Sequence, residues 1–350
     1  MKKIRIFSCP WHLGHQYELL KLNPYTDGQI EFYYCLNMIR KWSNSARPMP
    51  PHLNWVTHYE PGKYDLAILH IDQQCVDPTI GKSWLYNDLN RVIKDIPKIV
   101  VCHGTPLWPE QFDKNIIING GSVFFRGELV KIKGMKELVG DNFFVVNSYT
   151  AVKEWGWGYP IIHGLDPNEW YDLPKEPMVT TMISPAGLDR YYNRDLLRAV
   201  KELLIQDYGI TLYQITVDFL PNDWEEYKRF LGRCLIYFNP TYDSPMPRSR
   251  TEAMLSGCCV VTTKYHEADQ FIKSGKNGFI VPDNPRVIAD LINMLITQHY
   301  KEAVKIGEEG KKTAQKYFHI DRYLETWYHL IKMVLNGKKP TIRRPPWEEK

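Results

Sequence analysis

Residues 237–263 read YFNPTYDSPMPRSRTEAMLSGCCVVTT. An apolar run, a proline-rich loop, a short helical segment, a glycine and a second apolar run follow one another here. This order is typical of a parallel sheet that is covered by helices. Pro247 suits the first position of a helix, and Gly257 suits the left-handed position just after its end. We therefore predict a helix over residues 247–256 between two neighbouring strands.

The same alternation of β-rich runs and helical stretches continues in both directions along the chain. In the first half we predict strands at Ile4–Cys9, Asn54–His58, Leu66–Ile71, Lys98–Cys102 and Phe143–Asn147, and helices at Glu31–Trp42 and Ser83–Lys94. In the second half we predict strands at Met178–Ser184, Thr211–Val217, Leu235–Asn239, Cys259–Thr263 and Phe279–Val281, and helices at Asp195–Ile205, Asp223–Leu231, Pro285–Ile296, Lys301–Tyr317 and Asp321–Val334. Two doubly wound α/β domains fit this pattern best.

A stretch rich in turn-forming residues separates the two sets of strands, and it places the domain boundary near residues 164–176. We expect one Rossmann-like domain at residues 1–165 and a second at residues 166–320. A helix at 321–335 and an extended, basic, proline-containing tail at 336–350 follow them.

Composition and charge exclude several classes of protein. The 350 residues are 44% hydrophobic and 13% aromatic, which indicates globular domains rather than disorder. No run approaches the roughly 18 to 20 apolar residues that span a bilayer, so we expect a soluble, cytoplasmic protein. A net charge of +4 is too small to indicate nucleic-acid binding. The seven cysteines form no C-x-x-C pair and are expected to be reduced, buried thiols.

The loop after the first strand contains candidate binding residues, because ligands of open parallel sheets bind at the carboxyl ends of the strands. Gly14 would let backbone approach a phosphate or a sugar, and a helix that starts there would offer free N–H groups to an anion. The loop is not a G-x-G-x-x-G motif, which disfavours a dinucleotide-dependent dehydrogenase. His12 and His15 are weak metal candidates and better candidates for lining an acceptor site.

His103 closes the strand Lys98–Cys102 and precedes a turn that contains Gly104 and Pro106. This is a suitable place for a functional histidine. The alternative is a structural histidine that caps the strand through a backbone hydrogen bond. His70 is a similar but weaker candidate.

Arg248 and Arg250 lie at the start of the helix 247–256, where acidic residues would stabilise the helix better. The two cations indicate a phosphate-bearing ligand. The alternative is a pair of solvated surface arginines. Glu252 follows about one turn later and could accept hydrogen bonds from sugar hydroxyls, or it could pair with an arginine on the helix surface.

These residues resemble the donor-binding signature of retaining glycosyltransferases of the GT-B fold, family 4-like (group 1). The family pattern is Pro-Ser-x-x-Glu, seven residues, then Glu-Ala-Met-x-x-Gly-x-Pro-Val-Val. The chain has Pro240–Ser244, Glu252–Gly257 and Val260-Val261 in that order. Gly275–Val281, and upstream Val145–Ser148 with Ile162–Pro167, are similar to further elements of the family.

The sequence departs from the family pattern at two places. Ser244 stands at the position of the first glutamate and Asp243 is adjacent, so contacts to the donor sugar would change or move to Asp243. The family's diphosphate-binding arginine and lysine have only Arg190 and Arg194 as counterparts, both out of register.

The resemblance implies a GT-B enzyme whose two Rossmann-like domains face a central cleft. It would transfer a sugar from a nucleotide diphosphate sugar to a hydroxyl of a sugar, glycolipid or glycan acceptor, with retention and without a metal or other cofactor. The implied catalytic residues are His103, Glu252 and Arg190. Donor-binding residues would be Gly14, Arg194, Asp243, Ser244, Met246, Arg248 and Arg250. The acceptor would lie near His12 and His15, on the first domain, and the donor on the second.

The resemblance also implies that the helix 321–335 returns to the first domain; the alternative is a helix that covers the second domain alone. The basic tail would permit weak peripheral contact with a membrane, as in synthesis of cell-surface glycans or glycolipids; the alternative is a tail surrounded by solvent. Two other functions remain open. The first is a catalytically silent nucleotide-sugar binding protein, and the second is another enzyme on this fold, such as an epimerase or a phosphorylase.

Overall fold

The computed structural model describes residues 3–36, 41–43, 47–78, 80–106, 128–183, 191–215, 224–241, 244 and 246–349. The chain divides into two compact units. Unit 1 comprises residues 1–164 and 321–344, and unit 2 comprises residues 165–320 and 345–350. Each unit is built around its own parallel sheet.

In the part of unit 1 that the structure describes, seven strands form a sheet in the order β3-β2-β1-β4-β5-β6-β7. These strands are β1 (Ile4–Ser8), β2 (Ile30–Cys35), β3 (Asn54–Val56), β4 (Leu66–Ile71), β5 (Lys98–Cys102), β6 (Phe143–Val146) and β7 (Tyr159–Pro160). The helices of the unit are α1 (Leu13–Leu20), α2 (Leu22–Tyr25), α3 (Gly81–Val92), α5 (Glu128–Val139), α6 (Tyr149–Trp155) and α14 (Ile320–Leu335), with a 3₁₀ turn η1 (Gln73–Val76).

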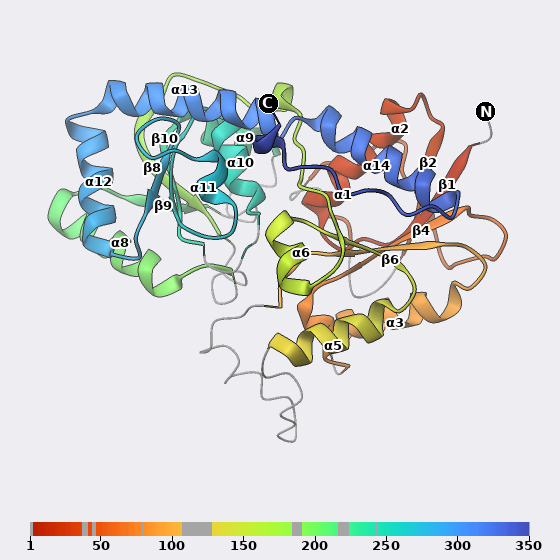
Figure 1. Cartoon of the computed structure of the whole chain (residues 1–350). Coiled ribbons are helices and arrows are strands. Elements are labelled where there is room, and N and C mark those ends of the chain that lie inside the picture. The colour runs from red at the N-terminus through yellow and green to blue at the C-terminus, as the bar shows by residue number, and fades with distance from the viewer. Residues whose placement is uncertain are drawn as a thin grey trace. The chain divides into compact units, whose positions relative to one another are not determined.

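The sheet of unit 1 lies between two layers of helices. Figure 1 shows α3 and α5 on one face of the sheet and α1 and α14 on the other. Every residue of β4 is buried, as expected for a central strand covered on both faces. Trp155 of α6 and Trp327 of α14 are completely buried, so both helices contribute to the interior of the unit.

One prediction for this unit is wrong. We expected a helix at Glu31–Trp42, but residues 30–35 form β2, which pairs in parallel with β1 and β3. The run IEFYYC consists mainly of β-branched and aromatic side chains, and its buried positions partly alternate with half-buried ones. Strand propensity and pairing on both sides outweigh the helical interpretation.

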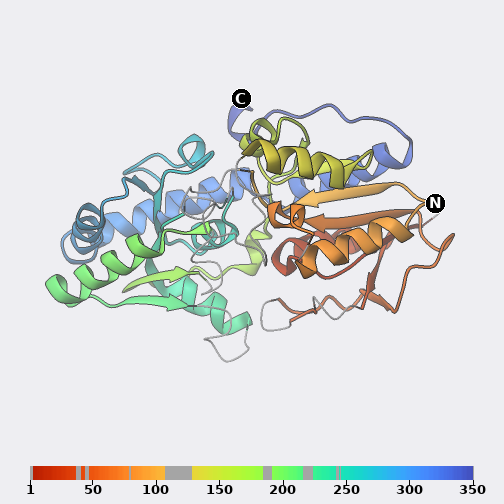
Figure 2. The ribbon, with the colours of Figure 1, turned by 90° about the horizontal axis from the view of Figure 1, so that it is seen from below.

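Among the described residues of unit 2, five parallel strands are ordered β12-β11-β10-β8-β9. They are β8 (Glu176–Met182), β9 (Leu212–Ile215), β10 (Cys234–Asn239), β11 (Cys259–Thr263) and β12 (Phe279–Val281). The helices are α8 (Arg194–Tyr208), α9 (Trp224–Arg233), α10 (Arg248–Leu255), α11 (Ala268–Phe271), α12 (Pro285–Thr297) and α13 (Tyr300–Tyr317), with 3₁₀ turns η2 (Pro167–Glu169) and η3 (Pro346–Glu348). Figure 2 shows this sheet edge-on among its helices, with α8 in green and α13 in blue.

Helix α10 is shorter than its prediction by one residue at each end, since Pro247 and Ser256 are its caps. Pro247 is the N-cap rather than the first helical residue, because its ψ of 114° is extended. Gly257 has a φ of 72°, as predicted for the residue that ends the helix. A Cβ atom on Gly307 of α13 would lie only 2.2 Å from the carbonyl oxygen of Gly257, so α13 packs directly on the end of α10.

The seven cysteines are free and buried, as predicted. Burial raises the pKa of their thiols, for example that of Cys9 to about 12. No helix in the described part of the chain is long and apolar enough to span a membrane.

Candidate functional site

In unit 2, two helices begin at the carboxyl edge of the sheet, beside the end of β10. The backbone N–H of Asn193, the N-cap of α8, donates to the carbonyl oxygen of Pro240 at 2.8 Å. Tyr192 and Thr241 form an isolated antiparallel bridge at the same place. Arg194 is the first residue of α8 and Arg248 is the first residue of α10. The two arginines therefore start helices whose N-terminal N–H groups and dipoles favour an anion.

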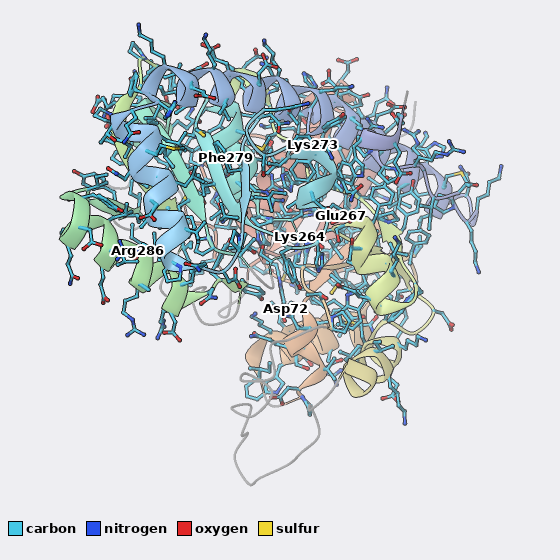
Figure 3. The ribbon with its side chains drawn as sticks, turned by 60° about the vertical axis from the view of Figure 1, so that its left-hand side comes forward. Asp72, Lys264, Glu267, Lys273, Phe279 and Arg286 are labelled. Atoms are coloured by element: carbon cyan, nitrogen blue, oxygen red, sulfur yellow. The ribbon has the colours of Figure 1, made fainter. Side chains whose placement is uncertain are left out.

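Arg250 is buried rather than solvated. Its side chain is 1% exposed and lies over the ring of Phe271, with 5.1 Å between the guanidinium carbon and the ring centroid. Nη2 contacts Sδ of Met246 at 3.6 Å, whereas Nε and Nη1 have no hydrogen-bond partner among the described residues. Burial lowers the pKa of Arg250 to about 10, against the opposing effect of Tyr192 and of the buried carboxylate of Glu267, labelled in Figure 3. Two of its nitrogens can therefore bind an added acceptor.

Glu252 lies two residues further along α10 and is 1% exposed. Its Oε2 accepts a hydrogen bond of 2.8 Å from the hydroxyl of Tyr227, on α9. The two partners expected for Glu252 were a sugar hydroxyl and an arginine on the helix surface, and not this tyrosine. No sequence motif marks Tyr227, since 25 residues separate it from Glu252.

Serine and tyrosine hydroxyls surround the start of α10. The hydroxyl of Tyr237 donates to Oγ of Ser249 at 2.8 Å. Burial raises the pKa of Tyr192, and hydrogen bonds with Ser244 and Ser249 partly oppose that rise. Ser244 is half-buried. The residue at the family's first-glutamate position therefore belongs to a hydroxyl cluster here.

In unit 1, a group of imidazoles lies at the carboxyl edge of the sheet. The rings of His12 and His103 are stacked with 4.9 Å between centroids, and the ring of His15 meets that of His103 edge-on at 5.0 Å. His70, at the end of β4, places Nδ1 3.1 Å from Nε2 of His103. The structure thus brings together His12, His15 and His103, which the sequence singled out separately.

Helix α1 carries part of this group. The Nδ1 of His12 caps the helix by accepting from the backbone N–H of His15 at 3.2 Å. Gly14 is the second residue of the helix, and its φ is not positive. His15 also contacts α14. The Tyr323 hydroxyl lies 3.2 Å from Nδ1 of His15, and the ring centroids of His15 and Trp327 are 5.8 Å apart. No pattern in the sequence indicated these two aromatic residues as neighbours of His15.

Gln73 lies next to this group and was not predicted. Its side chain is 3% exposed, and neither Oε1 nor Nε2 has a hydrogen-bond partner among the described residues. It packs against Gly104, the residue after His103, so closely that a Cβ atom at position 104 would lie 1.5 Å from Oε1. Gln73 therefore places a buried amide, without a partner among the described residues, beside His103.

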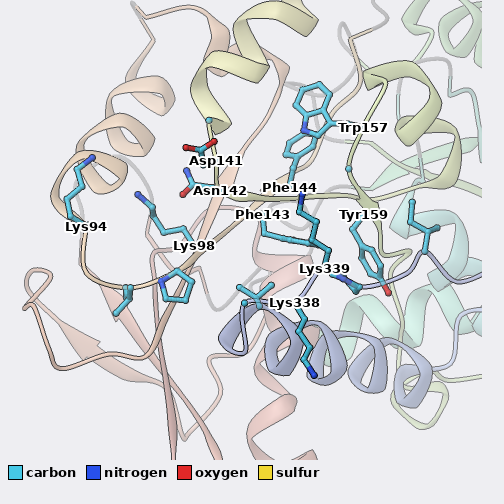
Figure 4. Close-up of a pocket in the computed structure, with 18 residues that line it drawn as sticks. Lys94, Lys98, Asp141, Asn142, Phe143, Phe144, Trp157, Tyr159, Lys338 and Lys339 are labelled. Carbon is cyan, nitrogen blue, oxygen red and sulfur yellow. The ribbon is translucent and has the colours of Figure 1, made fainter.

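A cavity of about 870 Å³ lies at the opposite, amino-terminal edge of the same sheet. Figure 4 shows it lined by Lys94, Lys98, Lys338 and Lys339, together with aromatic side chains that include Trp157 and Tyr159. Lys98 is the first residue of β5, whereas His103 follows the last residue of that strand. The cavity is therefore separate from the imidazole group.

Two predicted site residues, Arg190 and Asp243, lie outside the described residues. Among the residues that the structure describes, no group of three His, Cys, Asp or Glu side chains is arranged to hold a metal ion.

Comparisons with known proteins agree with this architecture. A family model described as glycosyl transferases group 1 matches residues 198–313. Spore coat protein SA of Bacillus subtilis (strain 168) is 30% identical over 86 residues, which are 24% of this chain and 22% of that protein. The chain therefore matches about a fifth of the length of that curated relative.

Three solved structures share the fold at low sequence identity. Sucrose-phosphate synthase from Thermosynechococcus elongatus has a TM-score of 0.61 at 13% identity, covering 97% of this chain and 100% of that one. Anabaena HepE in complex with UDP and glucose has a TM-score of 0.64 at 15% identity, with coverages of 95% and 100%. S. aureus TarM in complex with fondaparinux, alpha-GlcNAc-glycerol and UDP has a TM-score of 0.53 at 17% identity, with coverages of 77% and 55%. Residues 198–313 are thus similar to the glycosyl transferases group 1, and the two parallel sheets have the GT-B fold of these solved structures.

Proposed function

We propose that the protein transfers a glycosyl group from a nucleoside diphosphate sugar to an acceptor hydroxyl, with retention at the anomeric carbon. The observation that carries the proposal is Arg250, a buried guanidinium near the start of α10, two of whose nitrogens have no hydrogen-bond partner in the described part of the chain. Desolvating a cation without partners is unfavourable, and an anionic group would supply them. The matched family model, which includes α10, supports a sugar donor as that group.

In this proposal the leaving diphosphate is stabilised by fixed positive charge. Arg248, Arg250 and the N-terminal N–H groups of α10 would act on the developing charge, with Arg190 and Arg194 from the segment that leads into α8. Met246 would hold Arg250 in place. Glu252, fixed by Tyr227, would accept hydrogen bonds from donor hydroxyls, and Ser244 or Asp243 would contact the sugar.

The imidazole group of unit 1 would serve the other substrate and the transition state. His103 would orient the donor sugar as its bond to the diphosphate breaks. Gly14 would contact the donor, and His12 and His15 would line the acceptor site. The step forms a new C–O bond to the acceptor oxygen and breaks the C–O bond to the diphosphate, which assists in taking up the acceptor proton. No metal ion enters the proposal, as the family resemblance implies.

The solved relatives support a uridine nucleotide as the donor. HepE is seen with UDP, with UDP-glucose and with UDP and glucose, and TarM is seen with UDP and a glycerol-linked sugar. We therefore propose a UDP-sugar donor and a sugar, glycolipid or glycan acceptor, in the synthesis of a cell-surface glycan or glycolipid by a cytoplasmic enzyme.

One observation favours a second candidate, a nucleotide-sugar binding protein without catalysis. Ser244 replaces the first glutamate of the family pattern, and its hydroxyl is engaged with Tyr192. This serine cannot supply the negative charge of a carboxylate to the donor sugar. Turnover distinguishes the two candidates, since both predict binding of the nucleotide.

The test measures both binding and turnover. Thermal shift and sugar release are recorded with UDP-, GDP-, ADP- and dTDP-sugars for the native protein and for Arg248→Ala and Glu252→Ala. Arg286→Ala is the control, because Arg286 (Figure 3) lies in the same unit and pairs with Asp207 on the surface. Stabilisation by one nucleotide with slow sugar release, lost in the first two variants only, supports the transferase. Stabilisation without turnover supports the silent binder, and no response to any nucleotide rejects both.

The exposed basic residues near the C-terminus support a weak peripheral contact with an anionic membrane. Lys338, Lys339, Arg343 and Arg344 are all exposed, and Ile342 among them is 49% exposed. Sedimentation with vesicles containing phosphatidylserine, compared with phosphatidylcholine alone, tests this proposal. Equal sedimentation with both kinds of vesicle would reject it.

A further inference from the structure

The amide of Gln16, on α1, has only one orientation that satisfies its backbone neighbours. Oε1 lies 2.7 Å from the backbone nitrogen of Trp11, which can only donate, and Nε2 lies 2.7 Å from the carbonyl oxygen of Cys9, which can only accept. Gln16 is completely buried, so no solvent competes for these bonds. One hydrogen of Nε2 remains for another acceptor.

That acceptor is Nε2 of His70, which lies 3.1 Å from the amide nitrogen. The hydroxyl of Ser8 is also near, at 3.4 Å from the same ring nitrogen, but it donates its hydrogen to the carbonyl oxygen of Ile68 at 2.7 Å. The shorter contact with Gln16 therefore requires Nε2 of His70 to be unprotonated. Burial lowers the pKa of His70 to about 3, so the ring is neutral and carries its single proton on Nδ1.

The Nδ1–H of His70 faces Nε2 of His103 at 3.1 Å. Nε2 of His103 must then accept, and a neutral His103 ring carries its own proton on Nδ1. Stacking on His12 and the edge contact with His15 hold the plane of this ring. The chain from backbone to Gln16, His70 and His103 thus determines which nitrogen of His103 is a donor.

We propose that Gln16 and His70 are positioning residues that hold His103 in its Nδ1–H tautomer, so that it offers an N–H donor to an oxygen of the bound substrate. The role of His103 toward substrate rests on the proposed function, whereas the tautomer rests on the hydrogen bonds alone. A ring in the other tautomer would offer a lone pair at Nδ1, which can accept a hydrogen bond from a hydroxyl but repels an anionic oxygen. This series of hydrogen bonds from Gln16 through His70 to His103, here called the relay, therefore selects the form of His103 that can stabilise negative charge developing on oxygen.

The experiment reads the tautomer directly. The full-length protein is labelled with ¹⁵N in its imidazole rings, and long-range ¹⁵N–¹H NMR spectra are recorded near pH 8. The His103 signals are assigned by their loss in His103→Gln. The expected result is a protonated Nδ1 and an unprotonated Nε2 in the native protein. A protonated Nε2 on His103 overturns the proposal, whatever the activity of the protein.

Two variants of His70 test the relay. In His70→Asn the side-chain amide nitrogen stands near the former Nδ1 and can still donate to His103, whereas His70→Phe cannot donate. We expect the Nδ1–H form to persist in the asparagine variant and to be lost in the phenylalanine variant. Unchanged His103 signals in a folded His70→Phe would overturn the proposal; if that variant does not fold, the native spectrum and His70→Asn still decide.

Turnover gives a second readout, once a donor is known. His70→Phe is expected to lower kcat about 10²-fold, as for removal of one positioned donor, with little change in KM for the donor, and His70→Asn is expected to recover most of that loss. Equal kcat losses in both variants would contradict the relay. If no sugar nucleotide is turned over but the native spectrum shows the Nδ1–H tautomer, the proposed function fails and the relay stands.

Discussion

The hydroxyl of Tyr227 donates a hydrogen bond to Oε2 of Glu252 over 2.8 Å, and both side chains are buried. Removing the hydroxyl in Tyr227→Phe leaves a buried carboxylate oxygen without that donor. We expect the unfolding free energy to fall by about 1 to 3 kcal/mol, as for the loss of a buried hydrogen bond to a carboxylate. Urea unfolding measures it.

The chain offers a matched control for this prediction. The hydroxyl of Tyr171 donates to Glu225 at the same distance of 2.8 Å, but at the surface. Tyr171→Phe should change the unfolding free energy by less than about 0.5 kcal/mol. Equal losses in the two variants would show that burial does not set the strength of the Tyr227 bond.

Arg250→Met is expected to separate stability from binding. The substitution removes a buried cation, two of whose nitrogens have no partner among the residues that the structure describes, and keeps most of the side-chain volume. Replacing a poorly compensated buried charge by an apolar residue is often neutral or stabilising. The Tm without ligand should therefore stay the same or rise, while the Tm increase caused by a nucleotide disappears.

Differential scanning fluorimetry with and without the nucleotide identified by the screen checks this result. The exposed Arg286 gives the control variant Arg286→Met, which should keep the full nucleotide response. A normal response in Arg250→Met would remove Arg250 from the donor site.

The close contact between Gln73 and Gly104 predicts that Gln73→Ala restores stability lost in Gly104→Ala. In Gly104→Ala the new methyl group would lie 1.5 Å from Oε1 of Gln73, so the amide must move. We expect a clear loss of unfolding free energy in Gly104→Ala and a recovery in Gly104→Ala with Gln73→Ala. The coupling energy should fall between about 0.5 and 3 kcal/mol. Additive effects in the double-mutant cycle would mean that the strain at residue 104 has another source.

His70 should make the protein sensitive to acid. Its pKa is lowered from 6.5 to about 3, chiefly by burial and also by His12, and His15 and His103 face it as well. The unfolded chain takes up a proton below about pH 6.5 and the folded chain does not, so stability falls as the pH falls from 6.5 toward 3.

Urea unfolding at pH 7.5 and at pH 5.5 tests this effect. Between these two values His70→Asn should lose about 1 kcal/mol less unfolding free energy than the native protein. The histidines that do not contact His70 are common to both proteins and cancel in the comparison. The same loss in both would indicate that His70 is not held neutral by the fold.

Much of the fold could be predicted because its strands are short, apolar and separated by clear turn signals. Leu66–Ile71, Lys98–Cys102 and Cys259–Thr263 are observed with the predicted bounds. The strand Ile30–Cys35 was assigned to a helix, since aromatic residues give no clear period over six positions. Its identity depends on pairing with β1 and β3, which only the assembled sheet provides.

The candidate site was predictable where residues share a motif, and not where they meet through the fold. The run from Pro240 to Gly257 carries a recognisable order of residues. Gln16, His70 and Tyr323 come from a helix near the start of the chain, a central strand and the last helix, so no local pattern joins them to His103. Likewise, nothing in the sequence shows that Arg250 is buried, because Phe271, whose ring packs against the guanidinium, lies on a different helix.

The path of the chain has a consequence for how the protein is made. Residues 321–344 belong to unit 1, although the whole of residues 165–320 is synthesised before them. Trp327, which is completely buried beside His15, therefore leaves the ribosome after the strands of both sheets. The imidazole group can reach its final packing only after residue 327 has emerged, so nascent chains that stop before residue 321 should hold these histidines in a loosely packed, protease-accessible state.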